Sequence, residues 1–133
     1  MDRETVLFAN EAFYRAFADR DMAAMDALWA REGPIACIHP GWGLLDGREA
    51  VMESWRGILG SSAAPAIRCR RARAFILGDA AFVTCFEAVG ADMLIATNVF
   101  VRERSGWKMV HHQAGPTAER PGDDDAPAPD RVH

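Results

Sequence analysis

The sequence lacks any apolar stretch long enough to cross a membrane. Its longest apolar runs are far shorter than the ~20 residues that a spanning helix requires. The first residues, Met1 to Glu4, lead directly into an amphipathic pattern, without the apolar core or the small-residue cleavage site of a signal peptide. We therefore expect no membrane association and a location in the cytoplasm.

An excess of positive charge is also missing. The 133 residues carry a formal net charge of −4, and this mildly acidic balance argues against binding to the phosphate backbone of nucleic acid. Arginines do gather in one strand-like segment, at Arg68, Arg70, Arg71 and Arg73. Because successive strand side chains point to opposite faces, this cluster divides between two faces and predicts surface or interface charge, not an anion site.

Cysteines are few and no CxxC pair occurs. The three residues, Cys37, Cys69 and Cys85, are widely spaced in apolar segments, which is typical of reduced, buried thiols. A nucleophilic Cys37 beside His39 is a weaker alternative. Two residues that point the same way from one strand lack an obvious hydrogen-bonding geometry for that chemistry.

The composition is that of one globular domain. Half of the residues are apolar, 50% of 133, which suffices to bury a core. Apolar residues at three- and four-residue spacings predict helices over residues 3–17, over residues 22–29 with Asp21 as N-cap, and over residues 47–60.

The rest of the domain reads as strands. A short strand is expected at 35–39, followed by an irregular loop at 40–43, and the alternating pattern after residue 66 predicts four longer strands at 67–77, 80–89, 93–103 and 107–113. Short glycine-containing turns make these four sequential antiparallel neighbours. The prediction is an α+β domain over residues 1–116, with helices on one face of a curved sheet. Residues 117–133, rich in proline and aspartate, are expected to form a disordered tail.

Several local sequences between Val6 and Pro116 strengthen this interpretation. They are Phe17, the Asp21-Met22 helix break, Leu28-Trp29, the His39-Pro40 turn, the stretch from Asp46 to Val51, and the stretch from Gly106 to His112. Together with the order of elements they resemble the nuclear transport factor 2-like superfamily, which includes ketosteroid isomerases and SnoaL-like polyketide cyclases. The resemblance implies a cone-shaped, cystatin-like fold with three N-terminal helices on the concave face of the sheet. It leaves activity open, because the family hosts isomerases, cyclases, hydrolases, dehydratases and non-catalytic dimerisation modules.

The resemblance implies a role for His39. The isomerases keep a catalytic aspartate, followed by proline, just after the first strand, and His39-Pro40 stands at that position. An imidazole there is expected to titrate near neutral pH and to act as a base. The same comparison puts Phe13 where those enzymes keep a tyrosine that donates to the oxyanion. Tyr14 is rotated about 100° around the helix from Phe13, so the chain lacks, at that position, the phenol donor on which a steroid-isomerase mechanism depends.

Glu87 has two interpretations. A two-residue turn at Gly78-Asp79 sets Glu87 opposite Arg70 on the neighbouring strand. The pair is then either a cross-strand ion pair on a partly wet face, or a pocket-lining carboxylate held ionised by Arg70 and able to orient a histidine.

The last strand carries two adjacent histidines, His111 and His112, which must face opposite sides of the sheet. A three-residue loop at 104–106 pairs Asn98 with His112, whereas a two-residue turn pairs Phe100 with His111. We favour His112 and Asn98 on the pocket side, because a wet cavity explains a polar pair better than a sheet interface does.

These observations predict a mostly apolar pocket for a small hydrophobic carbonyl or polyketide-like compound. The expected catalytic residues are His39 as base and Asn98, His112 or Trp42 as polarising donors. The expected pocket lining comprises Phe13, Tyr14, Trp42, Trp55, Glu87 and His111. A metal set of His39, Glu87 and His112 is conceivable, but HxH and HExxH motifs are absent, so no metal or other cofactor is expected.

A competing hypothesis is a binding or assembly module without turnover, in which the histidines are structural. In either case we expect a homodimer, since a sheet face bearing Val83, Val99 and Val101 would otherwise leave apolar surface in water.

Overall fold

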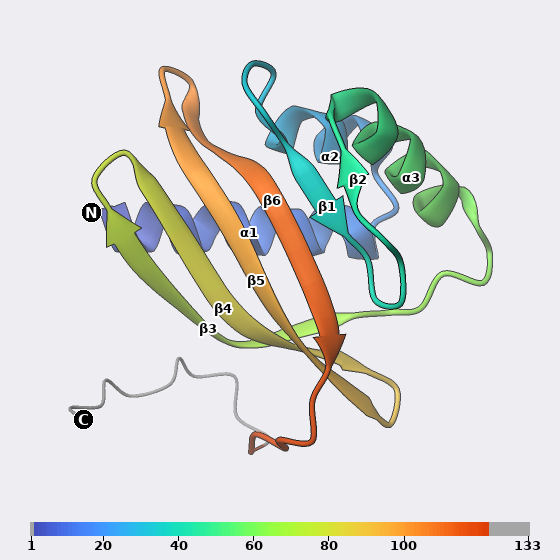
Figure 1. The fold of residues 1–133 in the computed structure, drawn as a ribbon. Helices are drawn as coiled ribbons and strands as arrows, with labels where there is room; N and C mark the ends of the chain where they lie inside the picture. Colours follow the sequence, from blue (N-terminus) through green and yellow to red (C-terminus); the bar gives the residue numbers. More distant parts are fainter. Residues whose placement is uncertain (1, 123–133) are drawn as a thin grey trace.

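The computed structural model describes residues 2–122 and has three helices on one side of a curved six-stranded sheet (Figure 1). In chain order the elements are α1 (Asp2–Ala18), α2 (Met22–Leu28), β1 (Ala36–Ile38), β2 (Leu45–Asp46), α3 (Arg48–Gly60), β3 (Arg68–Leu77), β4 (Ala80–Val89), β5 (Asp92–Glu103) and β6 (Gly106–Pro116). The α+β prediction is confirmed, and most predicted boundaries are within one residue of the observed ones. The short strand β2 was not predicted.

The break between α1 and α2 follows from local chemistry. Arg20 adopts a left-handed φ of 53°, a conformation that cannot continue a helix of L-residues. The carboxylate of Asp21 then accepts a hydrogen bond from the Ala24 amide at 3.0 Å, as predicted for an N-cap. This turn sends α2 back across the molecule, so that α1 alone crosses the four long strands (Figure 1).

The sheet is mixed, with the strand order β2-β1-β6-β5-β4-β3. The strands β3 to β6 form the predicted antiparallel series, and β1 adds to β6 in parallel, with Cys37 opposite His112. This parallel pairing brings the strand that leads to His39 beside the strand that carries the two adjacent histidines.

The predicted pairing of Glu87 with Arg70 is wrong by one residue. The hairpin begins as expected, with Leu77 opposite Ala80, but the register shifts between Arg70 and Arg73. Arg71, at a φ of 54°, lies in a β-bulge that adds one residue to β3. Glu87 therefore faces Cys69, while Arg70 faces Phe86 and lies on the opposite side of the sheet.

The predicted pairing of Asn98 with His112 is confirmed, but the predicted three-residue loop before it is wrong. The hairpin closes with Glu103 opposite Gly106, one residue tighter than the predicted three-residue loop. A register shift between Val99 and Phe100 follows, because Val110 is an extra residue on β6. The two departures cancel, and His112 faces Asn98.

The two faces of the sheet are unlike. The face toward α1 carries the core, in which the side chains of Phe13, Trp29, Trp55, Phe100 and Met109 are almost fully buried. No described helix covers the other face of β3 to β6, which is turned toward the viewer in Figure 1. We call this the open face. Val83 pairs with Asn98 on the core side, whereas Val99 pairs with His111 on the open face. The assignment of Val83 to one face with Val99 and Val101 was therefore wrong.

The chain after β6 stays in contact with the domain up to the last described residue. The amide of Thr117 donates to the Met93 carbonyl at 3.2 Å, and the Arg120 guanidinium donates to the Ala91 carbonyl at 2.9 Å. Arg70 donates to the carbonyl of Gly122. Residues 123–133, the larger part of the predicted tail, lie outside the described residues. Among residues 2–122 no helix is long and apolar enough to span a membrane.

Candidate functional site

A cavity of about 380 Å³ lies between the helices and the end of the sheet where β1 and the β4–β5 hairpin approach each other. Most of its lining is aromatic or aliphatic, and the polar members are few. The lining residues are Phe13, Phe17, His39, Pro40, Trp42, Trp55, Ile58, Pro65, Ile67, Glu87, Val89, Asp92, Leu94 and His112. An apolar cavity with a few convergent titratable groups is the usual form of a small-molecule site.

His112 is held in one orientation by a chain of amides. Its Nδ1 lies 2.5 Å from Oδ1 of Asn98, and the Asn98 amide nitrogen donates to Oδ1 of Asn10 at 2.8 Å. Because the Asn98 nitrogen is committed to donating, its oxygen must accept, so Nδ1 of His112 carries the proton. The Nε2 atom of His112 therefore keeps its lone pair. Burial, with smaller contributions from His39 and His111, lowers the pKa of His112 to about 3, so the ring is neutral at physiological pH.

Glu87 lies beside His112 and is joined to α1. Oε2 of Glu87 accepts a hydrogen bond from the Tyr14 hydroxyl at 2.6 Å and lies 4.0 Å from Nε2 of His112. The Tyr14 oxygen in turn accepts from Asn98 at 3.2 Å. Burial raises the pKa of Glu87, although the hydrogen bond from Tyr14 acts in the opposite direction. Burial, together with Cys85 and Glu87, also raises the pKa of Tyr14 well above its ordinary value.

His39 forms the opposite wall of the cavity. Its Nε2 lies 2.9 Å from the hydroxyl of Ser54, which itself donates to the Val51 carbonyl at 2.7 Å. Since the single hydroxyl proton is used, Nε2 of His39 must be the donor to Ser54. Burial lowers the pKa of His39 to about 4. The expectation that this ring titrates near neutral pH is therefore wrong, because the aromatic environment disfavours the cation.

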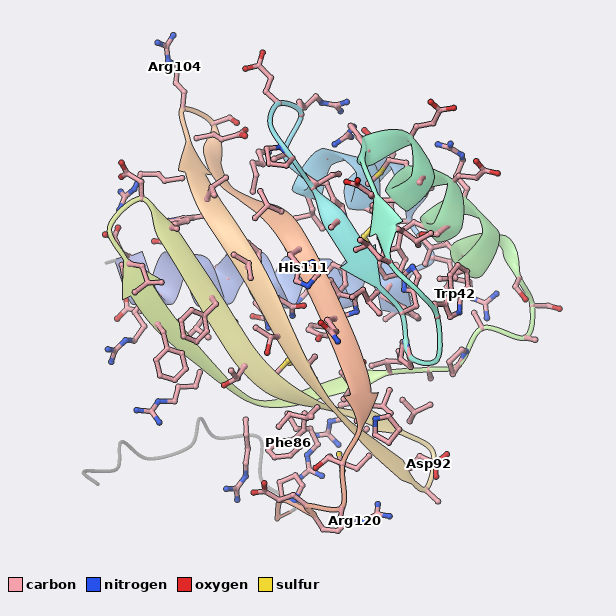
Figure 2. All side chains as sticks on the ribbon, viewed as in Figure 1. Trp42, Phe86, Asp92, Arg104, His111 and Arg120 are labelled. Carbon is pink, nitrogen blue, oxygen red and sulfur yellow. The ribbon has the colours of Figure 1, made fainter. Side chains whose placement is uncertain are left out.

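That aromatic environment is specific. The ring of His39 packs edge-on against Trp42 and Trp55, with centroid distances of 4.8 and 4.7 Å. Trp55 also contacts Phe13 at 5.5 Å. Trp42, labelled in Figure 2, is about half exposed, at 49%, and lines both the cavity and an outer groove along α3. The cavity is thus closed on this side by rings, one of which is accessible from outside.

Most of the residues expected at the site meet at this cavity, but three do not line it. The cavity is lined by His39, His112, Phe13, Trp42, Trp55 and Glu87. Asn98 and Tyr14 lie beneath it and hold His112 and Glu87. His111 is on the open face, where Nδ1 donates to the Ala36 carbonyl at 2.9 Å (Figure 2). The backbone alternation that brings His112 inward necessarily turns His111 outward.

Sequence reasoning missed several participants. The spacing places Asn10 on the inward face of the first helix, but its role as the end of the His112 chain depends on how far α1 is rotated. Asp92 lies at the end of the β4–β5 hairpin, at the rim of the cavity (Figure 2). Ser54 is three residues after Val51 on α3 and carries no motif signal. Only the arrangement of the elements places these residues.

Within the described residues, neither the thiols nor a metal cluster adds a further functional group to the cavity. Cys37, Cys69 and Cys85 are free cysteines, and burial raises the pKa of Cys37 to about 12. Within residues 2–122 no three His, Cys, Asp or Glu side chains are grouped closely enough to hold a metal ion. The titratable groups at the cavity are therefore two neutral imidazoles and two carboxyls.

The chain belongs to the SnoaL-like domain family, whose model matches residues 6–119. A proposed dehydratase of the nuclear transport factor 2-like family from Streptomyces avermitilis is 33% identical, with a TM-score of 0.80 over 89% of this chain and 97% of that one. A proposed calcium/calmodulin-dependent protein kinase type II association domain from Thiobacillus denitrificans is 36% identical, with a TM-score of 0.71 over 82% of this chain and 92% of that one.

F-box protein SKIP8 of Arabidopsis thaliana is 30% identical over 111 residues, which are 82% of this chain and 48% of that protein. The chain thus spans about half the length of the curated relative it matches. The family and the fold predicted from the sequence are confirmed. The relatives differ in their described roles, a dehydratase in one case and an association domain in another, so the activity must be argued from the cavity itself.

Proposed function

We propose that the chain binds a small, uncharged, mostly apolar carbonyl compound in the cavity and catalyses proton transfer on it, in a reaction of the isomerase, cyclase or dehydratase type. The observation that carries this proposal is the lone pair on Nε2 of His112. It belongs to a neutral imidazole at the cavity wall, and the contact of Nδ1 with Asn98 fixes the tautomer. A positioned imidazole of this kind is a common general base.

The base expected at His39 is here proposed at His112. The N–H of His39 is directed to Ser54, which lines the outer groove along α3 and not the cavity. His39 then acts chiefly as part of the aromatic wall. Both rings keep one unprotonated nitrogen, which is Nδ1 in His39 and Nε2 in His112. The nitrogen of His39 lies 3.9 Å from Sγ of Cys37, whereas that of His112 lies beside the Glu87 carboxyl, and this favours His112 as the base. The dehydratase described for the 33% identical relative supports acid–base chemistry in this fold.

Hydrogen–deuterium exchange into a panel of small apolar ketones and enones tests the proposal. Each compound is incubated with the protein in D₂O, and loss of the α-proton signals is followed by NMR. We expect exchange of at least one compound above the buffer rate, and a loss on the order of 10²-fold or more in His112→Gln. His111→Gln, which alters the neighbouring residue on the open face, is the matched control. Equal exchange with His112→Gln would refute His112 as the base.

A second candidate function is assembly. The 36% identical relative is described as an association domain, and the open face carries Ile95, whose side chain is 43% exposed. The strand residues around it form a shallow hollow that includes Thr84, Thr97 and His111. A homodimer through this face, with the chain in the cytoplasm, is compatible with either function. Binding of no ketone or enone, as judged by thermal shift, together with stable self-association, would favour the assembly module.

A further inference from the structure

Glu87 is a buried titratable group to which the proposed proton transfer at His112 gives no role. Its side chain is only 2% exposed, yet it lines the cavity from near the end of β4. The cation that the sequence placed opposite it, Arg70, is on the other side of the sheet, because the bulge at Arg71 shifts the register. Glu87 therefore lacks the arginine partner that would have kept it ionised.

The titratable groups around it supply no positive charge. Those that face the Glu87 carboxyl come from five elements: Tyr14 from α1, Cys37 from β1, Cys69 from β3, Cys85 from β4 and His112 from β6. His39, after β1, and Asp92, at the start of β5, line the same cavity. A phenol, three thiols, two neutral imidazoles and a second carboxyl include no cation. A carboxylate in such a setting would be desolvated without a compensating cation, which is costly.

We propose that Glu87 holds its proton in the free protein and is the general acid of the site, giving that proton to the carbonyl oxygen of the substrate while His112 takes one from carbon. The inference rests on the proposed function and specifies the partner of its base. The raised pKa of Glu87, caused by burial, agrees with this assignment. A carboxylic acid kept neutral in an apolar site is a known type of proton donor.

The step balances as an enolisation. The bond between the α-carbon and its hydrogen breaks, and the proton goes to Nε2 of His112. The electron pair forms a carbon–carbon double bond, and the carbonyl π pair moves to the oxygen, which takes the proton of Glu87. The products are an enol, the His112 imidazolium and the Glu87 carboxylate. Return of a proton from His112 to carbon, at the same or a conjugated position, and of the enol proton to Glu87 restores both groups.

The geometry favours formation of the His112 imidazolium together with the Glu87 carboxylate. Nε2 of His112 and Oε2 of Glu87 are 4.0 Å apart, so the cation and the anion form next to each other in a low-dielectric site and attract each other. Tyr14 donates to Oε2 of Glu87 at 2.6 Å, a hydrogen bond that strengthens as the carboxylate forms. Tyr14 is therefore a positioning residue, which acts through Glu87 and not on the substrate.

The same arrangement restricts the ligand class. Within residues 2–122 no arginine or lysine lines the cavity, and the acidic residues that do are Glu87 and Asp92. An anionic ligand would face carboxyls at the wall and at the rim without a counter-ion. We therefore expect uncharged ketones or enones to bind, and carboxylates of the same size to be rejected.

The protonation state of Glu87 is directly measurable. Protein labelled with ¹³C at the glutamate carboxyls is titrated by NMR, and Glu87→Gln identifies the Glu87 signal by its disappearance. We expect Glu87 to have the highest titration midpoint of the glutamates and to be protonated near neutral pH. Tyr14→Phe, which removes a bond that favours the carboxylate, should raise the midpoint further. Glu53→Gln, on α3 beside the outer groove, is the control. A Glu87 midpoint at or below those of the other glutamates would overturn the proposal.

Exchange kinetics separate this inference from the function on which it rests. With an exchanging ketone, Glu87→Gln should keep KM close to that of the unmodified protein, because the amide still donates a hydrogen bond, while kcat falls on the order of 10²-fold. Undiminished kcat in Glu87→Gln would overturn the acid role. A protonated Glu87 in a protein that exchanges no ketone would instead refute the proposed function. If Glu87→Gln does not fold, the Glu87 signal is assigned instead by its shift in Tyr14→Phe, which removes the hydrogen bond to Oε2, and the titration of the unmodified protein still decides the protonation state.

Discussion

Oδ1 of Asn98 lies 2.5 Å from Nδ1 of His112, and the same Asn98 side chain donates to Asn10 and to Tyr14. One fully buried amide thus links α1, β5 and β6 at the floor of the cavity. It fixes which nitrogen of His112 is free, and it also contacts the phenol that holds Glu87. His112 and Glu87 are therefore both oriented through a single residue that does not itself line the cavity.

Asn98→Ala should lower the free energy of unfolding by about 2–3 kcal/mol, because it leaves Nδ1 of His112 and Oδ1 of Asn10 buried without partners. Denaturant unfolding measures this change, and the imidazole ¹⁵N shifts of His112 should report loss of a single tautomer. The control is Thr97→Ala, which changes the preceding residue on the open face and should alter stability by less than about 0.5 kcal/mol. Similar losses in both variants would argue against the amide chain.

His39→Gln and His112→Gln distinguish the two possible bases. Glutamine keeps the approximate size of the ring and some of its hydrogen bonding, so His39→Gln should cost on the order of 1 kcal/mol and leave the fold intact. If His112 is the base, His39→Gln retains most of the exchange rate and changes mainly KM, because the aromatic wall is altered. Loss of exchange in His39→Gln, without earlier thermal unfolding, would return the role of base to His39.

The sequence predicts the fold well, because the fold depends on local signals. Glycines at the hairpin turns and the change from helical to alternating periodicity locate the elements. The bulges are different. Nothing in the arginine-rich segment indicates that Arg71 adopts a left-handed conformation, so the register of β3 with β4 could not be counted correctly. In the last hairpin the predicted turn is one residue too long and the bulge is not predicted. These two errors in register cancel, and this is why the predicted pairing of Asn98 with His112 is correct.

The candidate site, like the fold, is predictable only where local signals determine it. The outward and inward split of His111 and His112 follows from strand alternation alone. The hydrogen bond between Tyr14 and Glu87 does not, because it depends on the rotation of α1 against the sheet, which is set by packing and not by spacing. The pKa of His39 was expected near neutrality, since the sequence contains no measure of how completely Trp42 and Trp55 exclude water from the ring.

Acid should destabilise the protein through His39 and His112, which are both buried. A histidine with a lower pKa in the folded state takes up its proton first in the unfolded chain. The stability that the neutral rings contribute is therefore complete above pH 6.5 and is lost as the pH falls toward the folded values of about 4 for His39 and 3 for His112. We expect a loss of roughly 2–3 kcal/mol for each ring between pH 6.5 and about pH 4.5, by denaturant unfolding.

Variants at His39, His111 and Glu87 separate the contributions of these groups to the pH dependence of stability. His39→Gln should flatten the pH dependence of unfolding below pH 6.5, and His111→Gln, on the open face, should not. Glu87 contributes with the opposite sign. Its raised pKa makes the protonated folded form favourable at low pH, and that contribution is lost as the pH rises above 4.5. The free energy of unfolding of Glu87→Gln, relative to that of the unmodified protein, should therefore increase as the pH rises. A constant difference across this range would contradict the assignment.

The homodimer is tested at the open face. Ile95, 43% exposed there, should become buried on association, and Ile95→Glu would place a charge in the interface. We expect sedimentation velocity at micromolar concentration to show a dimer for the unmodified protein and a shift toward monomer for Ile95→Glu. Phe8→Glu is the control, since Phe8 is 72% exposed but lies on α1, on the other side of the sheet. A monomer for the unmodified protein would refute the dimer.

Two truncations test the segment after β6. The composition of residues 117–133 predicts that their removal leaves thermal stability almost unchanged, but residues 117–122 contact Met93, Ala91 and Arg70. Truncation after Gly122 should therefore be nearly neutral, whereas truncation after Pro116 should cost about 1–2 kcal/mol, because three hydrogen bonds to the domain are lost at its edge. Differential scanning calorimetry of both forms measures the two effects. Equal stability of the two forms would mean that these contacts contribute nothing net, and a large loss on removing residues 123–133 alone would mean that those residues bind the domain or a second subunit.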